Sequence, residues 1–318
     1  MAGRRGVSDS EARFIAEGCR VDCRADGRAR DEFRSYTVVA AGNSVEANLR
    51  RNPPLVLSQG SARVFVATGE THSLVSVKAE LVKPAAERPK EGGVTVHADA
   101  GSTRGDNDEL ESILNNLLVP HLLDAKSLCI CTELYAWKLH IDVLFLSSAG
   151  GSVLDVASLG INAALMSTLL PKVTFCPSNE GDDKGSLQLD ADVSAGDFVF
   201  KGEGRAPPSI ITVTALKNPR GQGSSFILDA TKAEEACAYA QVHAVVDVSG
   251  TTPRIASLQT SGEEPLSLAA FQDATSFVLE SAPTESRKFA LGGGDAPSEL
   301  LLQPTFVVQQ SSIDHSAA

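Results

Sequence analysis

The most constraining feature of the sequence is the junction at 136–166, where a strand pattern runs into a glycine pair and then an apolar helix pattern. The stretch from 148 to 166 reads SAGGSVLDVASLGINAALM. Its apolar residues fall on one face of a helix expected over 151–170. Two adjacent glycines before a helix let backbone N–H groups close around a phosphate. The junction therefore predicts a strand, a turn and a helix, and it raises the question whether a phosphate site remains there.

Strand and helix patterns alternate along the rest of the chain. An N-terminal helix is expected over 8–18, because Ser8 and Glu11 have the spacing of a capping box. Further helices are expected over 107–119, 231–236 and 265–281. Strands are expected over 36–41, 61–69, 72–81, 92–100, 127–132, 136–146, 173–176, 197–202, 209–216, 225–229, 239–248 and 253–260. This order predicts an α+β or α/β domain with mixed sheets and helices on one face.

The chain divides into three regions by pattern. Residues 1–34 are expected to form a helix and a basic loop, and residues 35–290 the main domain. Its two halves are expected at about 35–125 and 126–290, with an acidic insertion, 177–197, in the second half. The tail, 291–318, has no sustained period and is expected to be flexible.

Composition excludes several classes of function. The chain has 40 acidic and 28 basic residues, for a formal charge of -12, and this field opposes non-specific binding to nucleic acid. Its six cysteines contain no CxxC pair, so reduced thiols and no metal site are expected. No segment reaches the roughly 18 apolar residues of a membrane span, and no signal peptide is visible. We therefore expect a soluble intracellular protein without a membrane partner.

Four blocks of sequence, in order, resemble one known family. They are SDSEARFIAEGCRVDCRADGRARDEFRSYTVV, GSARVFVATGETHSLVSVKAE, YAWKLHIDVLFLSSAGGSVLDVASLGINAAL and LDATKAEEACAYAQVHAVV. Together they resemble the RNase PH-like ring subunits of the eukaryotic RNA exosome, over about 10–290. The resemblance implies an RNase PH fold of the ribosomal protein S5 domain 2-like type, built from two βαβ-like halves.

The same resemblance implies an assembly and a place in the cell. The expected partners are other RNase PH-like subunits in a hetero-hexameric ring, S1/KH cap subunits, an associated hydrolytic exoribonuclease, and RNA threaded through the channel. The expected compartments are the nucleus, with the nucleolus, and the cytoplasm. Active members of the family degrade RNA from its 3′ end by phosphorolysis, whereas inactive members hold the ring together.

The positions that match the family's phosphate site are degenerate. Active members have an Asp-Gly-Gly-Thr-Arg type sequence at this turn, whereas the positions after Ala149 here are Gly150, Gly151, Ser152 and Val153. Val153 has no charge with which to neutralise a phosphate. Ser152 and Asp155 have the spacing of a capping box, so we expect the Asp155 carboxylate to occupy the positive end of the helix dipole.

The other two catalytic features are also incomplete. Active members place two aspartates six residues apart, and the matching positions are Glu235 and Gln241. A carboxylate facing an amide does not make the pair that metal binding or acid–base catalysis needs. We expect Thr231 and Glu234 to form a capping box that leaves Glu235 on a solvated face. The segment of the helix expected over 107–119 has no arginine between Arg104 and Lys126, and it presents four acids, Asp106, Asp108, Glu109 and Glu111.

These losses predict a structural ring subunit with no catalytic residues and no cofactor. Candidate RNA contacts are Arg24, Arg28, Arg34 and Arg63. For Arg28 and Arg34, intramolecular salt bridges to Asp22, Asp26 or Asp31 are the favoured alternative. The competing hypothesis for the whole chain is a phosphorolytic 3′–5′ exoribonuclease, active alone or with a neighbouring subunit. A small-molecule kinase would need a glycine-rich loop with a catalytic carboxylate, and the GGG at 292–294 is too weak a signal for one.

Overall fold

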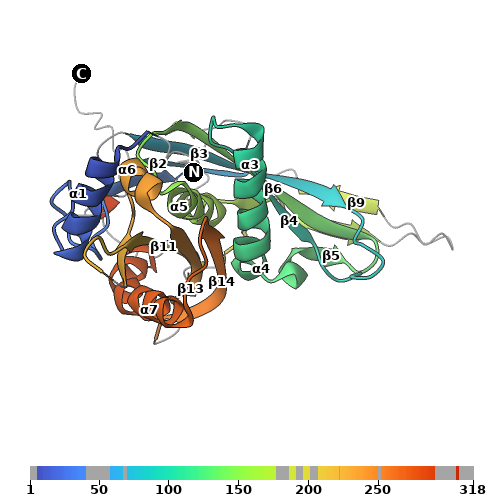
Figure 1. Cartoon of the computed structure of the whole chain (residues 1–318). Coiled ribbons are helices and arrows are strands. Elements are labelled where there is room, and N and C mark those ends of the chain that lie inside the picture. The colour runs from blue at the N-terminus through green and yellow to red at the C-terminus, as the bar shows by residue number, and fades with distance from the viewer. Residues whose placement is uncertain are drawn as a thin grey trace, which may run out of the picture.

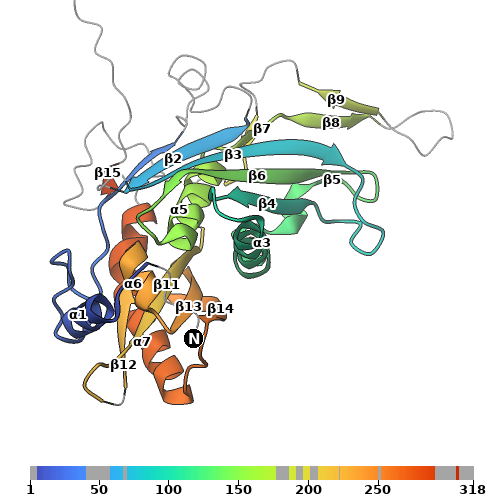
Figure 2. The same cartoon turned by 45° about the horizontal axis from the view of Figure 1, so that its top comes forward.

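A computed structural model describes residues 6–40, 58–66, 70–176, 186–190, 196–200, 207–221, 223–249, 252–290 and 306–307. Within these residues the chain forms two main sheets with a helix between them (Figures 1 and 2). Most of the expected tail, 291–318, and most of the expected acidic insertion, 177–197, lie outside the described residues. The glycines at 292–294 lie outside them too.

The first sheet contains seven strands in the order β15-β1-β2-β3-β6-β4, with β5 paired to β6. These strands are β1 (Tyr36–Ala40), β2 (Gly60–Val66), β3 (Thr71–Val82), β4 (Gly93–Asp99), β5 (Cys129–Cys131), β6 (Tyr135–Ser148) and β15 (Phe306–Val307). Pairing is antiparallel except for β4 with β6 and β1 with β15. Alternate residues of β2, β3 and β6 are buried, because one face of this sheet packs on the core.

The second sheet is antiparallel, with the order β12-β11-β13-β14. Its strands are β11 (Ser209–Lys217), β12 (Ser224–Leu228), β13 (Ala240–Asp247) and β14 (Arg254–Gly262). Helix α5 (Val153–Met166) lies between the two sheets and contacts β2, β3 and β11. Helix α7 (Leu268–Ala290) packs on the other face of the second sheet (Figure 2). Because α5 is covered on two sides, nearly all of its residues are buried rather than one stripe alone.

A broken helix follows β4 and lies beside it (Figure 2). It consists of α3 (Arg104–Ile113), a π-helical segment η1 (Leu114–Leu118) and α4 (Val119–Leu122), and a 3-10 turn η2 (Ala125–Leu128) comes next. Two small sheets pair β7 (Leu169–Leu170) with β10 (Asp197–Phe198) and β8 (Val173–Cys176) with β9 (Ser186–Leu189). The N-terminal helix α1 (Asp9–Arg20) packs beside α6 (Lys232–Cys237).

The structure confirms the order of the expected elements and adds three strands that were not among them, β7, β9 and β15. The Ser8 hydroxyl accepts a hydrogen bond from the Glu11 N–H at the start of α1, as its spacing predicts. Helix α5 ends at Met166, before β7, and not at 170. Two further features of the arrangement differ from expectation. The expected boundary at 125/126 does not separate the sheets, because β6 lies between β3 and β4 in the first sheet. The helices do not share one face either, since α5 separates the sheets and α7 covers the outer face of the second. Helix α7 also begins at Leu268, three residues later than expected.

Candidate functional site: a closed phosphate turn

The turn between β6 and α5 holds the positions that match the phosphate site. Gly151 and Ser152 both have positive φ angles, 77° and 52°. A Cβ on Gly151 would come within 2.8 Å of the Ala230 carbonyl oxygen, so the turn packs tightly against the start of α6. The carbonyl of Gly151 accepts a hydrogen bond of 3.2 Å from the Thr71 hydroxyl. Glycine at position 151 therefore allows the turn before α5 to pack closely against the segment that begins α6.

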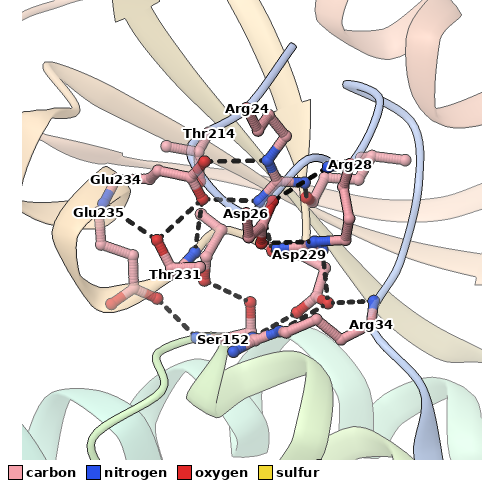
Figure 3. Close-up of polar contacts among 12 residues, drawn as sticks. Arg24, Asp26, Arg28, Arg34, Ser152, Thr214, Asp229, Thr231, Glu234 and Glu235 are labelled. Atoms are coloured by element: carbon pink, nitrogen blue, oxygen red, sulfur yellow. Dashed lines mark hydrogen bonds and ion pairs between the residues drawn. The ribbon is translucent and has the colours of Figure 1, made fainter. Parts of the chain in front are cut away.

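Ser152 does not form the expected capping box. Its backbone has the left-handed αL conformation, and its side chain makes no cap hydrogen bond at the start of α5. Its hydroxyl instead donates to the Ala230 carbonyl at 3.0 Å, and its backbone N–H donates to Glu235 Oε1 at 2.7 Å. Figure 3 shows the Glu235 side chain directed at this turn. The carboxylate at the N-terminal end of α5 is thus supplied by Glu235 of α6, far along the chain, and not by Asp155.

Asp155 is buried and lies in the first turn of α5. Burial raises its pKa to about 8, and the charges of Asp229 and Glu235 add to that effect. A carboxyl group with this pKa keeps its proton at neutral pH. Asp155 lies in the first turn of α5 as expected, but burial favours its neutral form, and the carboxylate that accepts from the Ser152 N–H is Glu235.

Glu235 is also less exposed than expected. Its side chain retains 20% of its exposure and lies 3.5 Å from the Lys232 ammonium. Burial raises the pKa of Glu235, whereas Lys232 and the Ser152 N–H both favour the ionised form. The capping box of Thr231 and Glu234 is confirmed, but it directs Glu235 towards the turn and not onto a solvated face.

Arg34 lies beside this turn and is held by Asp229. Its Nη2 and Nε atoms donate to Asp229 Oδ1 and Oδ2 at 2.6 and 2.9 Å, a bidentate pair (Figure 3). Its backbone N–H also donates to Asp229 Oδ2, at 2.7 Å, and its Nη1 donates to the Gly150 carbonyl at 2.6 Å. The Arg34 side chain is 6% exposed and that of Asp229 is fully buried.

Arg28 and Arg24 complete a buried network with the same segment. Arg28 donates to Asp26 Oδ2 at 2.7 Å and to Asp229 Oδ2 at 3.1 Å. Arg24 makes a bidentate pair with Glu234, at 2.9 and 2.6 Å, and also donates to the Asp229 carbonyl at 2.9 Å. Its side chain has no exposed surface. In this structure these guanidinium groups are paired within the chain. Of the local pairs proposed for Arg28 and Arg34, only Arg28 with Asp26 is present, and Arg34 pairs with the distant Asp229 instead.

The network keeps its charges despite burial. Arg34 and Arg28 hold the pKa of Asp229 at about 2, although burial alone raises it. Asp229 raises the pKa of Arg34 in return. Sequence reasoning named Asp26 as a partner of Arg28, but it missed Asp229 and Glu234. Their one signal was the acidic segment LDATKAEEA, which follows β12.

The other two candidates lie elsewhere. Gln241 is on β13, and its amide donates to the Thr214 hydroxyl at 3.4 Å. Arg63 is half-buried on β2, with its guanidinium 5.1 Å from the centre of the Phe65 ring. Arg63 Nη2 lies 3.3 Å from His72 Nε2, and the His72 ring stacks on Phe65 at 4.2 Å. The proximity of Arg63 and partial burial lower the pKa of His72, burial being the larger cause.

The described residues contain neither a metal-binding cluster nor a membrane-spanning helix. No group of three or more His, Cys, Asp or Glu side chains there is arranged to hold a metal ion. No helix in the same part of the chain is long and apolar enough to cross a membrane. None of the six cysteines, which all lie within the described residues, forms a disulfide bond.

Comparison with known proteins agrees with this fold. Residues 51–171 match the 3′ exoribonuclease family, domain 1. The Archaeoglobus fulgidus exosome, solved with RNA bound to its active site, has a chain that superposes with a TM-score of 0.64 at 20% identity, over 88% of this chain and 98% of that one. This chain therefore has the same fold as that exosome chain, and its matched segment covers β2, β3, β4, β6 and α5.

Its curated relatives are exosome components. The chain is 26% identical over 270 residues to exosome complex component RRP45A of Arabidopsis thaliana, covering 80% of this chain and 76% of that protein. It is 24% identical over 271 residues to exosome complex component Rrp42 of Methanothermobacter thermautotrophicus, covering 82% and 87%. The chain is therefore similar to exosome components of the RRP45 and Rrp42 type, and residues 51–171 match domain 1 of the 3′ exoribonuclease family.

Proposed function

We propose that this chain is a non-catalytic structural subunit of an exosome ring, where it supports 3′–5′ processing and degradation of RNA by forming part of the RNA channel. Its relatives are exosome components, and a related exosome core binds RNA. In this role the chain supplies wall and interface, while another subunit or an attached nuclease cuts the RNA. Ribosomal RNA maturation and messenger RNA turnover are the processes it would serve.

One observation carries the non-catalytic part of the proposal. The Glu235 carboxylate lies 2.7 Å from the Ser152 N–H, at the turn where a phosphorolytic enzyme must bind orthophosphate. A second anion there would meet this carboxylate at contact distance, with Val153 in place of a cation. Arg34, the cation beside the turn, is already paired with Asp229. Orthophosphate therefore finds no free donor at Ser152, and the two cations described beside the turn, Arg34 and Lys232, already pair with Asp229 and Glu235.

The proposal includes partners and compartments. The partners are other RNase PH-like subunits in a hetero-hexameric ring, S1/KH cap subunits, a hydrolytic exoribonuclease, and RNA in the assembled channel. The compartments are the nucleus, including the nucleolus, and the cytoplasm. Support for the ring partners and for RNA comes from the relatives and the RNA-bound exosome; the cap subunits, the nuclease and the compartments follow from the family resemblance alone.

The test is a phosphorolysis assay on 3′-labelled and 5′-labelled RNA with orthophosphate. We expect no nucleoside diphosphate from the isolated chain. We also expect equal rates from a reconstituted ring that contains either the natural chain or its Glu235→Gln variant. Release of nucleoside diphosphate by the isolated chain, or a loss of ring activity confined to the variant, would support the phosphorolytic 3′–5′ exoribonuclease instead. A matched ring with Glu263→Gln, another glutamate of the second-sheet region, controls for a general effect of charge removal.

A further inference from the structure

The outer edge of β4 carries backbone N–H and C=O groups with no neighbouring strand among the described residues. Such an unpaired edge lets another chain add a strand to the sheet. Among the described residues, β4 is the last strand of the first sheet, with β6 on its inner side. It runs parallel to β6, and in a parallel strand the N–H groups of alternate residues point to the same side. The groups of Val96 and Ala98, and of Ala100 just beyond the strand, point outward in this way.

Each of these three N–H groups donates to a side chain of the broken helix that follows β4. Val96 N–H donates to Asn115 Oδ1 at 2.9 Å. Ala98 N–H donates to Glu111 Oε1 at 3.0 Å, and Ala100 N–H donates to Asn107 Oδ1 at 3.1 Å. The Asn115 amide also returns a hydrogen bond, from Nδ2 to the Val96 carbonyl at 2.7 Å. Asn115 thus makes with Val96 both bonds that a peptide group of a neighbouring strand would make.

The spacing explains why one helix reaches three edge groups. The three helix residues are four apart, which is about 6.0 Å of rise along an α-helix. The three strand residues are two apart, which is about 6.6 Å along a parallel strand. Residue numbers rise along the helix as they fall along the strand, so helix and strand run in opposite directions. The two repeats stay in step over three contacts, and α3 lies beside β4 in both views (Figures 1 and 2).

These three side chains differ from their neighbours on the helix. Asn107, Glu111 and Asn115 are half-buried, whereas Glu109 and Asn116 are exposed. The apolar residues of the helix, such as Leu110 and Leu114, pack in the core. The three polar residues therefore form a stripe at the border between core and solvent, where the edge of β4 lies.

We propose that Asn107, Glu111 and Asn115 form a side-chain ladder that takes the place of a neighbouring strand and closes the β4 edge to strand addition by another chain. Partner subunits and further copies of this chain must then pair elsewhere. The inference stands on the contacts of β4 and does not depend on the proposed role in RNA processing. It also assigns Glu111 a use other than repelling RNA from this helix.

The test combines hydrogen exchange with a measurement of self-association. In the triple variant Asn107→Ala/Glu111→Ala/Asn115→Ala, we expect the amides of Val96, Ala98 and Ala100 to exchange at least about 10-fold faster, with β6 unchanged. Light scattering at rising concentration should then show association that the natural chain lacks. The double variant Glu109→Ala/Asn116→Ala removes two exposed side chains of the same helix and should behave like the natural chain. A folded triple variant with unchanged exchange, or one that stays monomeric, would overturn the proposal.

A second comparison keeps the proposal testable if the triple variant does not fold. Glu111→Gln keeps an oxygen that accepts from the Ala98 N–H, whereas Glu111→Ala removes it. We expect faster exchange at Ala98 only in Glu111→Ala. Equal exchange in the two single variants would show that the carboxylate contact does not protect the edge.

Discussion

Asp229 forms a salt bridge with the guanidinium of Arg34, which lies 195 residues away in the sequence. Both carboxylate oxygens take part, at 2.6 and 2.9 Å, and neither side chain is appreciably exposed. This pair joins the loop that follows α1 to the segment between β12 and α6. Because Arg34 also donates to the Gly150 carbonyl, the same contact holds the degenerate phosphate turn in place.

We expect Asp229→Asn to lower the free energy of unfolding by about 3–5 kcal/mol, because it leaves the buried Arg34 guanidinium without its counter-charge and removes one of the two acids that pair with Arg28. Urea-induced unfolding measures this loss. Asp26→Asn is the matched control, since Asp26 also pairs with Arg28 but keeps 35% of its side-chain exposure. Its cost should stay below about 1 kcal/mol. Equal losses in the two variants would contradict the central role of Asp229.

The depressed pKa of Asp229 predicts a loss of stability in acid. Its folded pKa is about 2, against an ordinary value of 3.8. The stabilisation is present above pH 3.8 and is lost as pH falls through about 2, because the unfolded chain binds the proton first. The loss is about 2 kcal/mol over this range. Unfolding curves from pH 5 to pH 2 should show it in the natural chain, and the Asp229→Asn chain should lack this component.

Asp155 predicts the opposite dependence on pH. Its folded pKa is about 8, so the unfolded chain releases the proton at lower pH than the folded chain does. The contribution of Asp155 to the free energy of unfolding therefore falls as pH rises above about 4, and at pH 7 it is lower by roughly 4 kcal/mol. Asp155→Asn keeps a neutral side chain of the same size and should remove this decline. The stability of the variant relative to the natural chain should therefore rise with pH. A constant difference between the two chains from pH 4 to pH 8 would show that Asp155 is ionised when folded.

Arg63 remains the predicted RNA contact whose guanidinium has aromatic neighbours and no acidic partner among its described contacts. We expect Arg63→Ala to weaken RNA binding by the reconstituted ring roughly 3- to 10-fold and to reduce the salt dependence of binding by about one counterion. Lys78→Ala is the control, because Lys78 is an exposed cation on the neighbouring strand that pairs with Asp142. Fluorescence anisotropy at several salt concentrations distinguishes the two variants. The same loss in both would indicate a general effect of charge.

Local order was predictable from the sequence to within a few residues at most elements. The strand expected over 173–176 is β8, and the strands expected over 72–81 and 209–216 are β3 and β11 with small extensions. The capping boxes had mixed outcomes. Thr231 and Glu234 form one, whereas Ser152 and Asp155 do not, because Ser152 is held left-handed by the approach of Ala230 and Glu235.

The charges of the site show why the rest was not predictable. Sequence proximity suggested Asp22, Asp26 and Asp31 as partners for the N-terminal arginines, and only Asp26 pairs with one of the candidates. Arg24 and Arg34 pair instead with Glu234 and Asp229, which no local pattern connects to them. The three helix residues that cover β4 have an i, i+4, i+8 spacing in the sequence, but that spacing has no meaning until a strand edge lies beside it.

The sequence by itself determined which segments form strands and helices, because apolar period and capping act over a few residues. It also placed Val153, Glu235 and Gln241 at the positions that the family resemblance assigns to a phosphorolytic site, since residue type can be read without a structure. The tertiary structure alone decided which acid meets which base, and which carboxylate accepts the hydrogen bond of the Ser152 N–H. Those choices depend on how two sheets pack around α5, and burial then sets the charge of Asp155 and Asp229 in opposite directions.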